Sequence, residues 1–225
     1  MKTHAARAFL LTLLSLGLAA APAGCGGDAK DGPSKKKENE TPTGIERIRL
    51  DALPPLADPL PPLEGGTIEI APPEGWNIAR RSGLIAVFFE NNSVPLPRMD
   101  VSVKDAPDAP MATAGEKNIE KLAEHLAAGL NERSVAEPPR AILLGDRAAV
   151  RYVKHTKFQG TAAQSLIVAA LRQGKLYEFT LHVFDGQLDK KGLDGYTPRQ
   201  EAYAVVAGTK FLAGAEATDA TAEGG

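Results

Sequence analysis

Apolar and polar residues alternate along several short stretches of the chain, and this period of two residues predicts β-strands. Met99, Val101 and Val103 alternate with polar neighbours, which is typical of a half-buried strand. Residues 84–89 form a continuous apolar run, which favours a buried strand. The expected strands are 67–70, 76–79, 84–89, 99–104, 142–144, 147–158, 164–171 and 175–185.

A period near 3.6 residues predicts one helix in the middle of the chain. Thr113 and Glu116 form a capping-box pair at its start. Its apolar face is Ile119, Leu122, Ala123, Leu126, Ala127 and Leu130. His125 lies on the opposite, polar face.

A second helix is expected from Thr197, its cap, to about Ala207, with Pro198 at the first helical position. Phe211 and Leu212 then complete the core. The order of strands, helix, strands and helix predicts an α+β fold, in which helices cover an antiparallel sheet.

Residues 1–24 have the pattern of a secretory signal rather than of a folded element. Lys2, His4 and Arg7 precede an apolar run from Phe9 to Ala21, and small residues follow. The run is shorter than the roughly 20 residues that a membrane-spanning helix needs.

Cys25 is the only cysteine of the chain, and it directly follows the signal. The sequence Ala23-Gly24-Cys25 resembles the end of a bacterial lipobox, although Pro22 stands where an aliphatic residue is expected. The resemblance implies that Cys25 is acylated and becomes the mature N-terminus. The alternative is cleavage after Ala23, which would release a secreted soluble protein.

Residues 25–66 are expected to be a disordered, proline-rich tether, beginning at the lipidated cysteine. Residues 26–44 balance four lysines with four carboxylates and contain no large apolar side chain. Proline is dense between 54 and 62, which favours extended polyproline II. The leucines in this part either dock on the domain or stay mobile. We place the domain at 67–212 and a disordered tail at 213–225.

Composition and charge exclude several classes of protein. The 225 residues, 43% of them apolar, suffice for one domain. A net charge of −2, which becomes −4 after the signal is removed, gives no footprint for nucleic acid. One cysteine excludes a disulfide framework and a multi-cysteine zinc site.

The domain resembles the PsbP-like and DcrB-like α/β/α sandwich families. The resemblance rests on residues 73–76 (Pro-Glu-Gly-Trp), the central amphipathic helix, residues 145–148 (Gly-Asp-Arg-Ala) before a long meander, and a final Lys-Phe-Leu segment at 210–212. It implies the fold. It implies no catalytic residue, because these families contain photosystem accessory proteins, envelope lipoproteins and other interaction domains.

His155 and His182 are the weak metal-site candidates of the sequence. If the meander turns are tight, both histidines face Ser165, so that the three side chains form a row across one sheet face. The outer strands of such a row are about 9.6 Å apart, too far for two nitrogen ligands of one zinc ion. We therefore expect no metal and no cofactor.

Other chemical motifs are missing from the sequence. The loop 185–196 has several aspartates but lacks the EF-hand ligands, since Gln187, Lys190 and Tyr196 stand at the deciding positions. There is no nucleophile elbow, P-loop or dinucleotide fingerprint.

These observations favour a non-enzymatic binding or assembly module. We expect it in the cell envelope, held to the membrane by acylated Cys25, facing the periplasm or the exterior, with an unknown envelope protein as partner. The alternative is a small-ligand receptor or enzyme, with its site between the 147–185 meander and the C-terminal helix.

Overall fold

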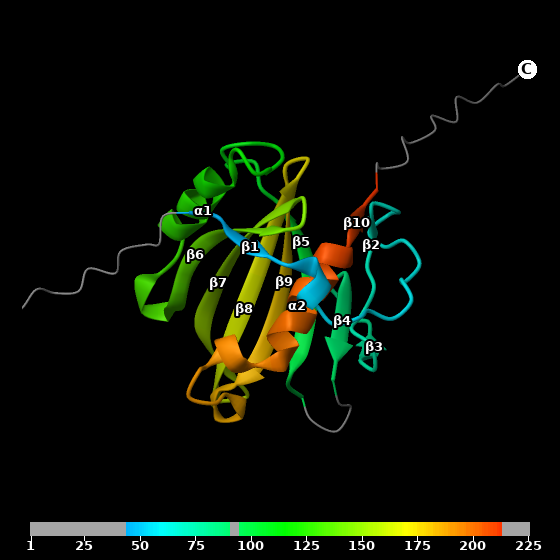
Figure 1. The fold of residues 1–225 in the computed structure, drawn as a ribbon, viewed down its shortest axis with the longest axis vertical. Helices are drawn as coiled ribbons and strands as arrows, with labels where there is room; N and C mark the ends of the chain where they lie inside the picture. Colours follow the sequence, from blue (N-terminus) through cyan, green and yellow to red (C-terminus); the bar gives the residue numbers. More distant parts are fainter. Residues whose placement is uncertain (1–43, 91–94, 213–225) are drawn as a thin grey trace, which may run out of the picture. The chain divides into compact units, whose positions relative to one another are not determined.

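An eight-stranded sheet forms the centre of the domain in the computed structural model, which describes residues 44–90 and 95–212 (Figure 1). Its strand order is β1-β6-β7-β8-β9-β5-β4-β3. The strands are β1 (Glu46–Ile48), β3 (Asn77–Ala79), β4 (Ala86–Phe89), β5 (Arg98–Asp105), β6 (Val135–Leu144), β7 (Arg147–Phe158), β8 (Thr161–Arg172) and β9 (Lys175–Phe184). Neighbouring strands are antiparallel except β1 and β6, which are parallel.

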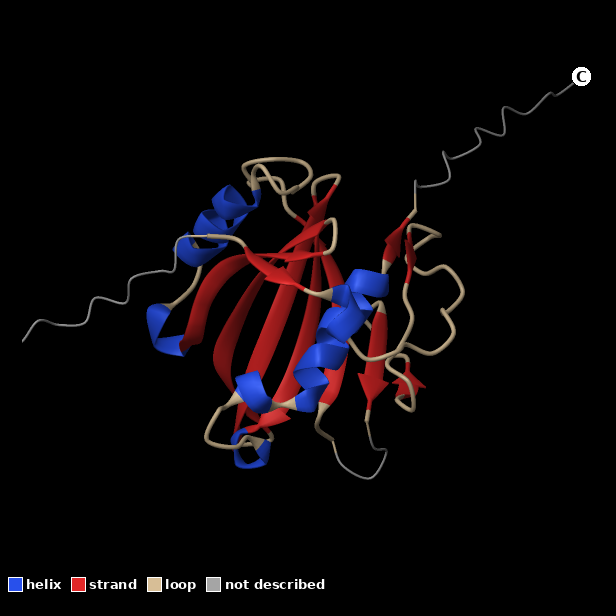
Figure 2. Cartoon of the chain, in the orientation of Figure 1, coloured by secondary structure: helices blue, strands red, loops and turns tan. Residues whose placement is uncertain are grey.

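One helix packs on each face of this sheet (Figure 2). Helix α1 (Ile119–Ala128) contacts β6 and β7, and α2 (Thr197–Gly208) contacts β8 and β9 on the other face. The middle strand β8 supplies both cores: Leu166 and Val168 pack with the α2 side, and Ile167 and Ala169 with the α1 side. The expected α+β class, with helices covering an antiparallel sheet, is confirmed.

Several short elements complete the domain. Strands β2 (Ile68–Glu69) and β10 (Lys210–Phe211) form a separate antiparallel pair beside the main sheet. The 3₁₀ turns are η1 (Leu50–Ala52), η2 (Glu132–Ser134), η3 (Asp185–Gln187) and η4 (Leu193–Gly195). Strand β10 returns the chain from the end of α2 to the strand ends of the meander, where Phe211 contacts Arg147 and Arg172.

The meander β7–β8–β9 is joined by two turns of two residues each. Gln159 and Gln173 both have φ of 49°, and the glycine that follows each also has positive φ. Positive φ at both central positions defines the type I′ turn, whose twist matches that of the flanking strands. Each turn leaves the strand ends directly opposite one another, as in the pair Arg172 and Lys175.

The ordered domain begins earlier than the expected boundary at residue 67. Strand β1 joins the main sheet, and four leucines of residues 53–63 pack against the α2-side core. The N–H groups of Ala57, Leu60 and Leu63 donate to carbonyls of Pro72, Ile70 and Ile68 at 2.8–2.9 Å. The second half of the expected tether is thus a strap bound to the domain, defined as residues 45–63.

The two helices form where the sequence predicts them, but neither expected cap is present. Helix α1 starts after Asn118, and the hydroxyl of Thr113 instead accepts the backbone N–H of Gln173. Helix α2 follows Tyr196, with Pro198 in its first turn. Thr113 thus makes a tertiary contact with the β8–β9 turn instead of capping the helix. The local sequence pattern cannot predict this contact.

Removing the strap tests the corrected boundary. Four half-buried leucines contribute about 4 kcal/mol if each contributes roughly 1 kcal/mol. We expect residues 67–225 to unfold at a clearly lower urea concentration than residues 44–225, and to bind an apolar fluorescent dye. Equal midpoints for the two chains would contradict the structural role of the strap.

Candidate functional site

Cys25, the expected lipidation site, lies outside the described residues, as do the signal segment and the tail at 213–225. Among the helices in the described parts of the chain, none is both long and apolar enough to span a bilayer. The first part of the expected tether also falls outside these parts.

The two candidate histidines lie on opposite faces of the sheet. His182 pairs with Ser165, as the tight second turn predicts. His155 pairs with Gln164, and Lys154 takes the place opposite Ser165. The expected row of two histidines around Ser165 is therefore wrong, because a shift of one residue in a strand moves a side chain to the other face.

His182 belongs to a chain of polar side chains on the sheet face opposite α2. Its Nδ1 lies 2.9 Å from the Ser165 Oγ, and its Nε2 lies 3.2 Å from the Asp100 carboxylate. Arg98 donates to the same carboxylate oxygen at 2.7 Å, and Thr156 lies 3.1 Å from Ser165 at the other end. Four strands thus contribute one continuous polar row, defined here as the His182 chain.

The His182 chain contains a serine, a histidine and an aspartate joined by hydrogen bonds, as in the catalytic triad of serine hydrolases. A nucleophile must be reached by its substrate, and Ser165 is only 2% exposed. Within the described residues, no group of three or more His, Cys, Asp or Glu side chains has a metal-binding arrangement. The geometry of the His182 chain instead suits a cross-strand link that holds β7, β8, β9 and β5 together.

The charge of Asp100 depends on its two partners. Burial raises the pKa of this carboxyl, but the hydrogen bonds and charges of His182 and Arg98 outweigh burial and hold the pKa below its usual range. Arg98 also lies over the Phe158 ring, 5.3 Å from its centroid. An ionised Asp100 is therefore part of the folded structure at neutral pH.

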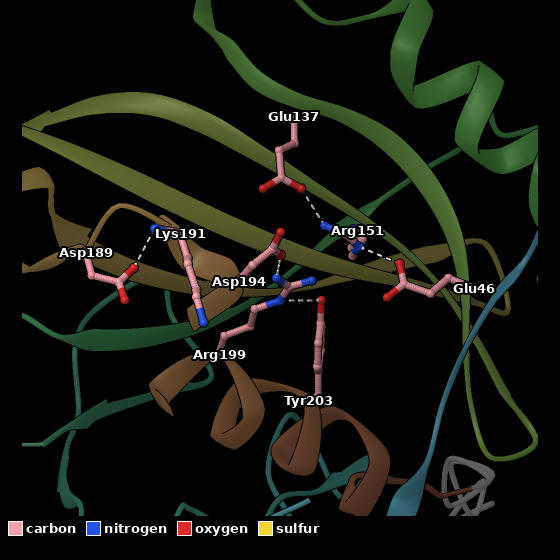
Figure 3. Close-up of polar contacts among 8 residues, drawn as sticks. All are labelled: Glu46, Glu137, Arg151, Asp189, Lys191, Asp194, Arg199 and Tyr203. Carbon is pink, nitrogen blue, oxygen red and sulfur yellow. Dashed lines mark hydrogen bonds and ion pairs between the residues drawn. The ribbon is translucent and has the colours of Figure 1, made fainter. Parts of the chain in front are cut away.

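Two buried arginines with acidic partners lie in the region between the meander and α2 (Figure 3). Arg151 of β7 donates to Glu46 at 3.0 Å and to Glu137 at 2.6 Å. Arg199 of α2 donates to the Tyr203 hydroxyl at 3.0 Å and pairs with Asp194. Each arginine has its own acidic partner, and this compensation is what a structural cluster requires.

The loop after β9 uses two of its acidic residues in local contacts. Asp194 pairs with Arg199, and an Asp189 oxygen accepts the Lys191 N–H at 2.7 Å. His125 is exposed on α1, as expected. None of these groups converges on a shared site.

A hollow of about 520 Å³ lies at the end of the meander, where the chain returns from α2. It is lined by Thr67, Thr113, Arg147, Arg172, Gln173, Lys175, Tyr177, Phe211 and Leu212. We call it the basic hollow, because its three charged side chains are all cationic. It lies between the meander and the segment that follows the C-terminal helix.

The three cations come from neighbouring strand ends. Arg147 begins β7, Arg172 ends β8, and Lys175 begins β9 directly opposite Arg172. Both guanidinium groups lie over the ring of Phe211, at 5.3 and 5.5 Å from its centroid. Within the described part of the chain, none of the three cations has a carboxylate at ion-pair distance.

This arrangement has an electrostatic cost. Burial lowers the pKa of Arg147, and the positive charge of Arg172 lowers it further, while Asp146 opposes both effects. Like charges opposite one another destabilise a sheet. Among the described residues no ion pair offsets this cost, which marks the basic hollow as the strongest candidate functional site.

The sequence interpretation missed these residues, although a signal was present. The tight turn at Gln173 and Gly174 already places Arg172 opposite Lys175. Arg147 follows the turn at Gly145 and Asp146, and both turns lie at the same end of a three-strand meander. Phe211 carries no such signal, because only the tertiary fold brings it to the meander.

No protein-family model matches the chain, and no curated protein matches its sequence. Similar solved structures include a protein from Bacteroides thetaiotaomicron VPI-5482, with 16% identity, a TM-score of 0.43 and coverage of 66% of this chain. The chain spans 46% of that protein's length, less than half.

Two further solved structures are similar at 13% identity. One is the cyanobacterial PsbP (CyanoP) from Synechocystis sp. PCC 6803, with a TM-score of 0.40 over 68% of this chain and 94% of that one. The other is LpqN, described as involved in cell envelope biogenesis of Mycobacterium tuberculosis, with a TM-score of 0.38 over 65% and 83%.

Replacing Asp100 tests the His182 chain. A carboxyl with a lowered folded-state pKa stabilises the fold above its ordinary pKa of about 4, and this contribution is lost as the pH falls through the folded-state value. We expect Asp100→Asn to lower the free energy of unfolding by about 2 kcal/mol at pH 7, and by less at pH 3. Urea unfolding at both pH values measures this difference.

The matched control is Asp108→Asn, since Asp108 is exposed. We expect it to change stability by less than about 0.5 kcal/mol at either pH. A deficit for Asp100→Asn that stayed constant between pH 7 and pH 3 would show that its charge does not matter.

Proposed function

We propose that the chain is a cell-envelope protein, anchored to the membrane by acylated Cys25, and that its domain is a non-enzymatic binding module. The observation that carries the binding role is the basic hollow, where Arg147, Arg172 and Lys175 meet without an acidic partner among the described residues. A ligand or partner with negative charge removes the repulsion between them. Binding therefore supplies the negative charge that the three cations lack among the described residues.

The chemistry of the hollow favours binding over catalysis. Its lining offers cations, hydroxyls, an amide and two aromatic rings, but no histidine, carboxylate or thiol. General acid–base catalysis near neutral pH depends mostly on such groups. The one ordered Ser–His–Asp arrangement in the described residues is on the opposite face, with its serine buried.

The proposed anchor and the domain are close in sequence. Since the strap begins at Ile45, the 19 residues 26–44 separate Cys25 from it, rather than the roughly 40 of the expected tether. A fully extended chain of that length spans at most about 65 Å. An anchored domain therefore stays close to the bilayer. Its available partners there are other components of the envelope.

The second candidate, a small-ligand receptor, is favoured by the position of the hollow. It borders the meander and lies beside the end of α2, because Arg147 donates to the carbonyl of Val206 in the last turn of that helix. The deeper space between meander and helix holds the Arg151 and Arg199 clusters (Figure 3). A receptor site is therefore proposed at the end of this layer and not within it.

Replacing Cys25 tests the anchor. We expect the wild-type chain to remain with membranes after high-salt washing and the Cys25→Ser chain to be released into the soluble fraction. The reason is that two or three acyl chains bind a bilayer far more firmly than one. Mass spectrometry of the N-terminal peptide provides the control, and an unmodified Cys25 in the membrane fraction would contradict acylation.

A photo-crosslinker tests the binding role. Benzoylphenylalanine replaces Gln173, which lines the hollow, or Gln159, which has the same φ of 49° at the opposite end of β8. In intact cells, we expect an envelope component to be crosslinked from position 173 and not from position 159. The Cys25→Ser chain should give a weaker product, because it is no longer held near the membrane.

Equal products from both positions would indicate random encounters. No product from position 173 would argue against a stable partner at the hollow. Either result would overturn the proposed site. The anchor is tested separately, by the Cys25→Ser fractionation.

A further inference from the structure

We infer that the basic hollow binds a phosphate group with two negative charges, carried by a small molecule or by a lipid headgroup that also has an apolar part. The inference rests on the proposed binding role of the hollow and not on the anchor at Cys25. It assigns a ligand chemistry to Arg147, Arg172 and Lys175, which stand together on three strand ends.

Charge balance selects a phosphate monoester over a carboxylate. Three formal positive charges surround the hollow, and its lining contains no anion. A phosphate monoester carries about −1.5 to −2 at neutral pH, whereas a carboxylate carries −1. Guanidinium groups also match phosphate oxygens in a two-pronged geometry, and two such groups are available here.

Both arginines are held in position by backbone carbonyls. Arg147 donates to the Val206 carbonyl, and Arg172 donates to the Ala114 carbonyl at 3.5 Å. Each guanidinium has five N–H donors, so most of them are left without a protein partner within the described ranges. The site is therefore oriented before any ligand arrives, and this reduces the entropy lost on binding.

Three acidic residues on neighbouring segments form no ion pair with the cations of the hollow. Asp146 raises the pKa of Arg147 through its charge but lies beyond ion-pair distance. Asp105 is the cross-strand neighbour of Lys175 and likewise forms no ion pair with it within the described residues. Glu69, on the adjacent β2, is already paired with Lys210.

An aromatic wall lies beside the cations. Tyr177 and Phe211 pack edge to face, with ring centroids 4.8 Å apart, and Leu212 continues the apolar side of the hollow. A free inorganic anion would leave this surface without contact. A phosphate joined to a ring or an acyl chain would use both parts of the lining.

Phenyl phosphate is the probe, because it combines a phosphate monoester with an aromatic ring. Isothermal titration calorimetry uses the full chain in detergent at pH 7.5 and low salt. We expect saturable binding, at least 10-fold tighter than that of benzoate. We expect Arg172→Gln to weaken it at least 10-fold, and Lys175→Gln about 3-fold.

The matched control is Arg81→Gln. Arg81 also stacks on a ring, with its guanidinium 5.7 Å from the Phe89 centroid, and it is exposed and outside the basic hollow. This variant loses the same charge and should bind as the wild-type chain does. Circular dichroism of each variant checks that the fold is intact. Because Lys175 is exposed, Lys175→Gln removes a charge from the hollow without changing the packing of the core.

No heat on titration, benzoate binding as well as phenyl phosphate, or equal weakening by Arg81→Gln and Arg172→Gln would each overturn the inference. A crosslinked partner at position 173 without phenyl phosphate binding would overturn this inference alone. Phenyl phosphate binding without any crosslinked partner would overturn the stable-partner role and support the receptor.

Vesicles distinguish the two sources of the phosphate. Phosphatidylcholine vesicles are prepared with and without phosphatidic acid, whose headgroup is a phosphate monoester, and the Cys25→Ser chain is sedimented with them. Binding that requires phosphatidic acid and Arg172, and that phenyl phosphate displaces, supports a lipid headgroup. Phenyl phosphate binding without vesicle binding supports a small soluble ligand.

Discussion

The register of the β7–β8–β9 meander is the constraint on which the rest of this domain depends. The Gln159-Gly160 and Gln173-Gly174 turns each contain two residues with positive φ, and they allow only one pairing of the strands that they join. That pairing decides which side chains of β8 enter which core. It also places Ser165 beside His182 on one face, and Arg172 beside Lys175 at the strand ends.

The elements of this fold could largely be predicted from the sequence, and both hairpin registers follow from the turns, although the expected register of the first hairpin is wrong by one residue. Turn chemistry alone correctly pairs His182 with Ser165. In β7, all residues from Ala148 to Val153 are buried, because helices cover both faces of the sheet there. A strand buried on both faces has no polar alternation to show its register, but the turn does show it. The Gln159-Gly160 turn pairs Phe158 with Thr161 and therefore His155 with Gln164, so the expected place of His155 opposite Ser165 is one residue out.

The strap shows a different limit of sequence reasoning. Prolines between 54 and 62 exclude regular ladder pairing, so the segment resembles a free linker. Its donors at Ala57, Leu60 and Leu63 are spaced three residues apart, which is the period of polyproline II. These donors and the leucines between the prolines face the domain together. Only the position of the neighbouring segment, residues 68–72, shows that this side of the strap has a surface to bind.

The arginines of the domain differ in whether a carboxylate pairs with them. Arg151 and Arg199 are 6% and 8% exposed and each has a carboxylate, and Arg98 shares Asp100 with His182. Arg147 and Arg172 are less buried, yet both lie over the ring of Phe211 and line one hollow with Lys175.

The chain has 28 acidic residues against 26 basic ones, so a shortage of carboxylates does not explain this exception. Three cations without an ion pair among the described residues meet in one concave surface, whereas Arg140, whose buried Nε also has no partner, stands outside it, opposite the paired Arg151. Departures of this kind are expected at functional sites. The physical reason is direct, since the repulsion that weakens the free domain becomes attraction once an anion is bound.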